Sequence, residues 1–182
     1  GLSSSRNSTL LQATLPPGSP TFSDPILFNN IFWDNRAGSW TGGGVSGIGQ
    51  NGDPNPIYRW DLGVAGTSNL LSPKYSLLHV AYSGADGTNL IGSDPLFGEM
   101  YDVGIRVYPW RGNPTFIGAE IVAVDLPPTL MGDYHLTAGS PAQNTGVASF
   151  AGISAANRDY DDVLRPAHGL WDAGADESII EP

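Results

Sequence analysis

Residues 133–146 read DYHLTAGSPAQNTG, and this segment limits the folds that the chain can adopt more than any other. The run Tyr134–Leu136 favours a short strand, and the Gly-Ser-Pro sequence that follows predicts its end. Gly139 can take a positive φ, and Pro141 has a fixed φ and no N–H to donate to a neighbouring strand. The chain must therefore turn after a few extended residues, and similar short runs bounded by turn residues recur along the sequence.

The composition favours a fold made of short strands and many loops. Gly (24) and Pro (15) together make up about a fifth of the 182 residues, whereas Lys occurs once and Glu four times. Long surface helices favour Lys and Glu, and turns favour Gly, Pro, Asn and Asp. The length of 182 residues is compatible with one domain and a sizeable core. We therefore predict a single all-β domain over residues 1–182.

Charge and cysteine content exclude several classes of function. The formal net charge is −10 and the pI about 4.3, which disfavours nucleic acids and anionic membranes as partners and fits an extracellular protein or a cationic partner. The absence of Cys excludes disulfides, thiolate metal sites and a Cys nucleophile. No apolar run is long enough to span a membrane. Because the sequence begins with Gly1 and carries no signal peptide, we expect a processed chain or a piece of a longer one.

Strand candidates are short and are separated by turns. Their starts lie roughly twenty residues apart, which is in the range of solenoid repeats. A β-sandwich is the alternative, but it would favour longer alternating strands at regular short spacing. The candidates are Pro25–Asn35, in which Asn29-Asn30 predicts a corner, Ile57–Leu62, Lys74–Tyr82 and Thr88–Ile91.

Four segments are expected to depart from this regular pattern. Residues 1–24 predict an extended N-terminal segment, in which Thr9–Leu15 forms one short strand. Residues 36–56 and 98–132 predict two long insertions, the second with strands of its own. Residues 147–182 predict an irregular segment that closes the domain.

Several short motifs occur in a characteristic order. They are NNIFWDN at residues 29–35, YSLL at 75–78, GTNLIGSDPLF at 87–97, DYHL at 133–136, GSPAQNTG at 139–146, Arg165-Pro166 and WDAGADE at 171–177. Together they resemble the C-terminal portion of bacterial secreted right-handed parallel β-helix proteins, which are pectate-lyase-like and include proteins with a choice-of-anchor type Q domain.

The resemblance implies a short right-handed parallel β-helix with two long insertions, and a secreted or cell-surface location. It does not imply one activity, because the family includes polysaccharide lyases, hydrolases and proteins of unknown role. The family usually has more coils before this point. A shorter solenoid would leave an open end, and we expect another protein chain, or copies of this one, to stack on it.

No catalytic residue is predicted. Hydrolases of the pectin-active β-helix type use clustered carboxylates, and the Asn-Thr-Asp, Asp-Asp and Gly-His-Gly pattern of the family is absent as a set. The pair Asp161-Asp162 stands without these partners. The three His residues are widely separated, and no Gly-x-Ser-x-Gly elbow is present.

One acidic turn is a candidate cation site. Asp159, Asp161 and Asp162 lie next to Arg158 and Arg165, and carboxylates are the ligands that Ca²⁺ prefers. The alternative is a solvated turn whose Arg and Asp side chains pair with one another. No cofactor other than Ca²⁺ is predicted.

Exposed aromatic side chains are the candidate binding residues. Trp40 lies beside the run of three Gly residues, and Tyr108 and Trp110 flank Pro109 in the second insertion. Aromatic rings on a β surface can stack on sugars or anchor a protein partner. The alternative is that these side chains cover a small core.

Together these features favour a non-enzymatic extracellular module. We expect it to dock onto another protein chain, onto copies of itself or onto a surface polysaccharide, without nucleic acid. The alternative is a polysaccharide lyase or glycoside hydrolase fragment. A carboxylate cluster on one exposed face would favour the enzyme, and an apolar patch at the Leu10–Ile31 end would favour docking.

Overall fold

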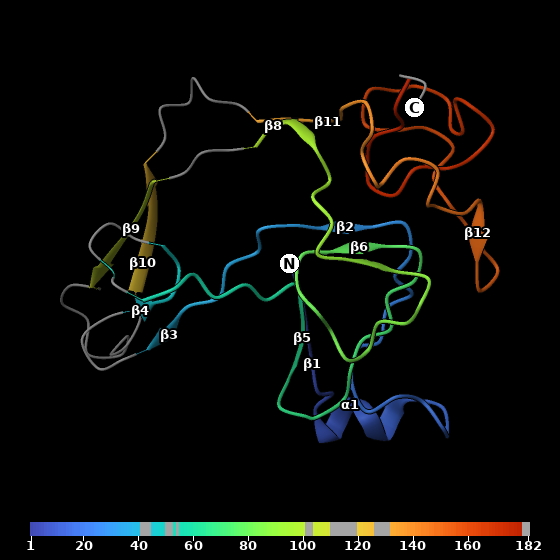
Figure 1. Ribbon diagram of the computed structural model, residues 1–182. Helices are drawn as coiled ribbons and strands as arrows, with labels where there is room; N and C mark the ends of the chain where they lie inside the picture. The colour runs from blue at the N-terminus through green and yellow to red at the C-terminus, as the bar shows by residue number, and fades with distance from the viewer. Residues whose placement is uncertain are drawn as a thin grey trace.

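A computed structural model describes residues 1–40, 45–49, 53, 55–100, 104–109, 120–125 and 132–179 (Figure 1). At Trp40, Val45 and residues 104–109 and 120–125 the description covers the backbone alone. Short strands in small sheets dominate this part of the chain, so the all-β prediction is confirmed at that level. In chain order the elements are β1 (Leu2–Ser5), α1 (Thr9–Thr14), β2 (Ile31–Phe32), β3 (Ser39–Trp40), β4 (Val45–Ser46), β5 (Leu62–Ala65), β6 (Leu77–Leu78), β7 (Leu90–Ile91), β8 (Phe97–Glu99), β9 (Gly104–Pro109), β10 (Glu120–Asp125), β11 (Asp133–Leu136), β12 (Ser149–Phe150) and β13 (Ile153–Ser154).

The centre of the molecule is a parallel sheet with the strand order β2-β6-β7. Its register places Ile31 beside Leu77 and Leu77 beside Leu90. Successive side chains of a strand point to opposite faces. Leu77 and Leu78, both fully buried, accordingly enter two different apolar clusters.

The two clusters form the core. The first core cluster is buried between the central sheet and the C-terminal half of the chain, and the second joins the central sheet to β5. Each fully buried Leu contributes about 1.5–3 kcal/mol relative to an exposed one. The first consists of Leu77, Leu136, Ala142 and Ala173 with the partly buried Ile31, Trp33, Leu90 and Phe97; the second has Leu62, Leu71 and Leu78 at its centre.

The N-terminal segment differs from the prediction. Strand β1 pairs in parallel with β5, but residues 9–14 form the helix α1 instead of a strand. The Ser8 side chain accepts the N–H of Leu11 and so caps the helix N-terminus. A short apolar run in a sequence does not distinguish a helix from a strand. Here the Ser8 cap and the good helix formers Leu, Gln and Ala favour the helix. None of the helix residues is buried.

The corner predicted at Asn29-Asn30 is confirmed. Asn29 has a φ of +56°, which an Asn tolerates better than most residues. Its side-chain amide donates to the Val147 carbonyl at 2.7 Å and accepts the Val147 N–H at 2.9 Å. These two hydrogen bonds therefore connect the residues before β2 with the C-terminal segment.

Both predicted insertions contain antiparallel pairs. Strands β3 and β4 pair within the first insertion, and β9 pairs with β10 within the second. Strand β8 pairs with β11 at the base of the second insertion (Figure 1). After this pairing, Leu136 of β11 packs with Leu77 of the central sheet in the first core cluster.

The C-terminal segment contains the antiparallel pair β12–β13 and many loops, and a buried ion pair organises it. Arg165 Nε donates to Glu177 Oε2 at 2.9 Å, and the two side chains are only 5% and 2% exposed. The Asp172 carboxylate accepts the N–H groups of Asn144 (2.7 Å) and Ser178 (2.8 Å). These bonds hold the loop that contains Asp176 against β11.

Candidate functional site

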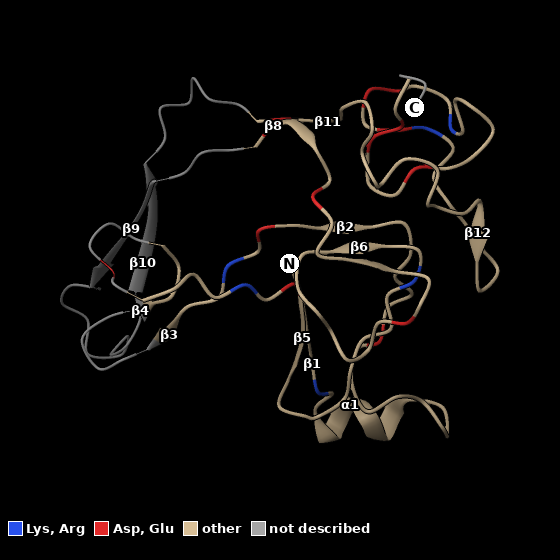
Figure 2. Ribbon diagram, viewed as in Figure 1, with Lys and Arg blue, Asp and Glu red and all other residues tan. Residues whose placement is uncertain are grey.

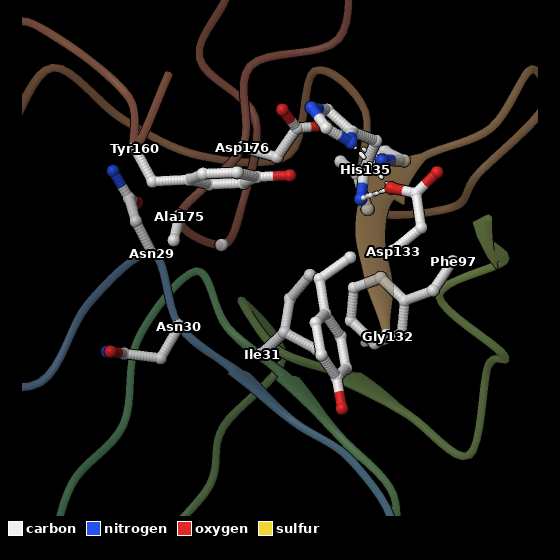
Figure 3. Close-up of a pocket in the computed structure, with 13 residues that line it drawn as sticks. Asn29, Asn30, Ile31, Phe97, Gly132, Asp133, His135, Tyr160, Ala175 and Asp176 are labelled. Carbon is white, nitrogen blue, oxygen red and sulfur yellow. Dashed lines mark hydrogen bonds and ion pairs between the residues drawn. The ribbon is translucent and has the colours of Figure 1, made fainter. Parts of the chain in front are cut away.

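A cavity of about 760 Å³ opens between β2, β11 and the C-terminal loops (Figure 3). Apolar side chains, among them Ile31 and Phe97, line one part of it. Polar side chains line another part, and no Lys or Arg is among the lining residues. This cavity, called here the His135 pocket, is lined by Asn29, Asn30, Ile31, Phe97, Gly132, Asp133, Tyr134, His135, Leu136, Tyr160, Gly174, Ala175 and Asp176.

Strand β11 positions the central side chains of the pocket. Asp133 and His135 are two residues apart and therefore share one face of the strand. Asp133 Oδ1 lies 2.5 Å from His135 Nδ1 and also accepts the His135 backbone N–H at 3.1 Å. Leu136 points the other way, where it is buried in the first core cluster.

The other ring nitrogen of His135 faces a second carboxylate. His135 Nε2 lies 2.5 Å from Asp161 Oδ2. Hydrogen bonds with Asp133 and then Asp161 raise the pKa of His135 to about 9, and the bond with His135 lowers the pKa of Asp133. At neutral pH the imidazole is therefore cationic and donates from both nitrogens.

A third carboxylate reaches the same place from the C-terminal loop. Asp176 is 5% exposed, and its Oδ2 accepts the Leu136 N–H at 2.7 Å. Burial raises the pKa of Asp176, and it also raises the pKa of the neighbouring Tyr160 to about 12. One ligand atom each of His135, Asp161 and Asp176 lie within 4.8 Å of one another.

Aromatic rings border the acidic cluster. Tyr160 lies with its ring centroid 5.1 Å from that of His135, and its ring crosses the pocket in Figure 3. Phe97 and Tyr134 form an edge-to-face pair with centroids 5.3 Å apart. The pocket thus combines aromatic surface with carboxylate, imidazole and amide groups.

The candidate binding aromatics cannot be placed at the pocket. Trp110 lies outside the described residues, and so do the side chains of Trp40 in β3 and Tyr108 in β9. They stay predictions.

The three candidate Ca²⁺ ligands have different surroundings. Asp161 faces His135. Asp159 Oδ1 accepts the N–H groups of Asp161 and Val163. Asp162 is exposed beside Arg158. Among the described residues the ligand atoms that converge belong to His135, Asp161 and Asp176, so one of the three candidates joins that group.

The sequence interpretation did not single out Asp133, His135 or Asp176 as site residues. One local signal was present, because an Asp-x-His sequence in a predicted strand places both side chains on one face. Asp161 lies 26 residues after His135, and Asp176 lies further still. No local sequence pattern therefore indicates that they approach His135. Their position depends on the fold of the C-terminal segment, whose loops carry several Asp and Glu positions (Figure 2).

Comparison with known proteins adds no family to this description. Among the described residues, no helix has the length and apolar character needed to cross a membrane. The chain matches no protein-family model, and it has no match among curated proteins or solved structures.

Proposed function

We propose that this chain is a non-enzymatic interaction module that binds a neutral or amino-substituted glycan in the His135 pocket. The observation that carries the proposal is the composition of the pocket, in which aromatic and apolar side chains border Asp133, His135 and Asp176. A sugar ring has an apolar C–H face and a rim of hydroxyl groups. It therefore needs both kinds of surface, as ligand pockets in general combine apolar walls with a few placed polar groups.

The charge of the pocket selects the class of glycan. Its charged lining side chains are Asp133, Asp176 and the imidazolium of His135, and Asp161 lies directly behind the ring. The formal net charge of −10 adds a repulsive field for polyanions. A neutral sugar or an amino sugar fits this environment, whereas a polyuronate would need a bridging cation.

The scaffold we propose is a right-handed parallel β-helix of a secreted or cell-surface bacterial protein. Support comes from the resemblance of the motifs and from the register of the central sheet, in which Ile31, Leu77 and Leu90 lie side by side. Coils of a parallel solenoid stack equivalent residues in this way.

Docking onto another protein chain, or onto copies of this one, is the second part of the proposal. Leu10 is 80% exposed, and Leu11 and Ile26 are exposed as well. No residue of α1 is buried. An apolar partner that covered these side chains would remove them from water, and the native mass in solution tests whether copies of the chain do so.

Glycoside hydrolysis is a second candidate function, favoured by one observation. The pKa of Asp176 is raised by burial, whereas the pKa of Asp133 is lowered by its hydrogen bond with His135. Two carboxyl groups with pKa values pushed apart are the usual arrangement of a general acid and a base or nucleophile. Asp176 would then protonate the leaving group.

Calorimetric titration with a panel of oligosaccharides tests the proposal. Glucosamine oligomers and neutral glucan oligomers should bind, and polygalacturonate should not. Tyr160→Ala should weaken binding at least about tenfold, whereas Tyr58→Ala, which removes a ring of similar exposure (50% and 47%) outside the pocket, should not. If the protein cleaves a bound oligomer and the Asp176→Asn variant does not, the function is glycoside hydrolysis and not binding alone. Unchanged sugar affinity in the Tyr160→Ala variant would contradict the assignment of the His135 pocket as the binding site.

A further inference from the structure

The hydrogen bonds of His135 have the arrangement of a metal-binding imidazole. Histidine ligands commonly donate one ring N–H to a carboxylate, which fixes the ring orientation and leaves the other nitrogen for the metal. Asp133 occupies the first position, 2.5 Å from Nδ1. Nε2 points away from Asp133 toward Asp161. The ring is therefore oriented with Nε2 toward the acidic cluster.

Two carboxylates converge on the same nitrogen. The ligand atoms of His135, Asp161 and Asp176 all lie within 4.8 Å of one another. These three residues come from β11, from a turn and from the C-terminal loop. One nitrogen and two oxygens from different parts of the fold form a set that first-row divalent cations bind.

One carboxylate oxygen of Asp176 has no hydrogen-bond donor among the described residues. Asp176 is 5% exposed, and its Oδ2 accepts the Leu136 N–H. Its Oδ1 accepts no hydrogen bond from any described residue, although the side chain lines the pocket. An oxygen that no protein donor satisfies is available to a ligand in the pocket.

We propose that His135 Nε2, Asp161 and Asp176 bind a divalent transition cation of the Zn²⁺ class, with Asp133 orienting the imidazole. Tetrahedral zinc with bonds near 2.0–2.1 Å spaces its ligand atoms by about 3.3 Å. His135 Nε2 and Asp161 Oδ2 lie 2.5 Å apart and must separate slightly to reach this spacing. Small side-chain rotations achieve this, because His135 and Asp161 are about half exposed.

Binding exchanges a proton for the metal. The proton on His135 Nε2 leaves to solvent, Nε2 donates its lone pair to the cation, and the Nδ1–H bond to Asp133 persists. The two carboxylates balance the charge of the ion. A tetrahedral ion would keep a fourth position for water or a ligand oxygen.

This inference goes beyond the proposed function, because the site is complete without a sugar. The test is calorimetric titration of tag-free protein, first treated with a chelator, with Zn²⁺ and separately with Co²⁺, whose visible spectrum reports its coordination. A single Zn²⁺ should bind. His135→Ala and Asp176→Asn should each weaken binding by more than the about 10- to 100-fold expected for Asp133→Asn, the residue that only orients the ring.

Asp162→Asn is the matched control, because it removes a neighbouring exposed carboxylate outside the converging group. It should leave the Zn²⁺ affinity unchanged. Backbone amide spectra confirm that each variant is folded. Unchanged affinity in a folded His135→Ala variant, or no Zn²⁺ binding to the parent chain, would overturn the proposal. Failure of metal binding would leave the glycan titration unaffected, so the two proposals are tested separately.

Discussion

The Arg165 guanidinium and the Glu177 carboxylate form an ion pair of 2.9 Å in which both side chains are almost fully buried. Arg165 also donates to the carbonyl groups of Asp172 at 2.7 Å and Gly174 at 3.2 Å. Glu177 in turn accepts the N–H groups of Ala167 and Asp172. The pair therefore fixes both sides of the loop that places Asp176 in the His135 pocket.

Breaking this pair should destabilise the protein strongly. Glu177→Gln leaves the Arg165 charge buried without its counter-charge, which typically costs about 3–5 kcal/mol. Urea unfolding followed by tryptophan fluorescence measures the loss. Arg158→Gln is the control, because its pair with Asp162 is exposed and such pairs contribute about 0–1 kcal/mol. Equal losses in the two variants would contradict the assigned role of Arg165 and Glu177.

Leu77 should be among the most sensitive core positions. It is fully buried, lies at the centre of the parallel sheet between Ile31 and Leu90, and belongs to the first core cluster. Leu77→Ala removes these contacts and leaves a cavity, so the free energy of unfolding should fall by about 2–5 kcal/mol. Leu10→Ala, at an exposed site on α1, should change it little. The same urea titration checks both variants, and a small effect at Leu77 would argue against the central sheet as the core.

The Asn29 corner permits a test that separates backbone conformation from side-chain bonding. Asn29→Gly keeps access to the positive φ but loses both bonds to Val147, whereas Asn29→Ala also meets the cost of that φ. Both variants should be less stable than the parent, and the Ala variant should be the less stable of the two. Thermal unfolding in parallel samples gives the order. An Ala variant as stable as the Gly variant would show that the φ of Asn29 carries no cost.

The stability of the metal-free protein should depend on the protonation of His135. Its pKa is raised from 6.5 to about 9 by Asp133 and Asp161, so the folded state binds this proton more tightly than the unfolded state does. The stabilisation is therefore fully present below pH 6.5, and it is lost as the pH rises through about 9.

NMR titration of the imidazole protons, with a chelator present, measures this pKa directly. Asp161→Asn should lower the pKa of His135. His79 supplies an internal comparison, because burial lowers its pKa below 6.5 and it should titrate at lower pH than His135. A His135 that titrates near 6.5 would contradict the contacts with both carboxylates.

The sequence predicted those features that depend on local residue choice. The all-β class followed from the turn residues, and the positive φ at Asn29 followed from an Asn pair between two apolar runs. The helix α1 was not predicted, because Thr9–Thr14 is too short for its hydrophobic periodicity to distinguish a helix from a strand.

The His135 pocket depends on contacts between residues that are far apart in the sequence, and no local sequence pattern predicts such contacts. Asp133 and His135 share one face of a strand, but Asp161 and Asp176 approach them only through the folding of the C-terminal segment. Asp61 is a further example. It was placed in a predicted strand, but its buried carboxylate accepts the N–H groups of His79 and Val80. The sequence does not predict this burial, because the residues that bond with Asp61 lie further along the chain.

Amide chemical-shift mapping of the isotope-labelled chain, titrated with a glucosamine oligomer, tests the central claim most directly. If the His135 pocket binds the sugar, the shifts should concentrate at residues 29–31, 133–136, 160 and 174–176. Shifts confined to the segments around Trp40, Tyr108 and Trp110, or no shifts at saturating sugar, would contradict the assignment of this pocket as the binding site.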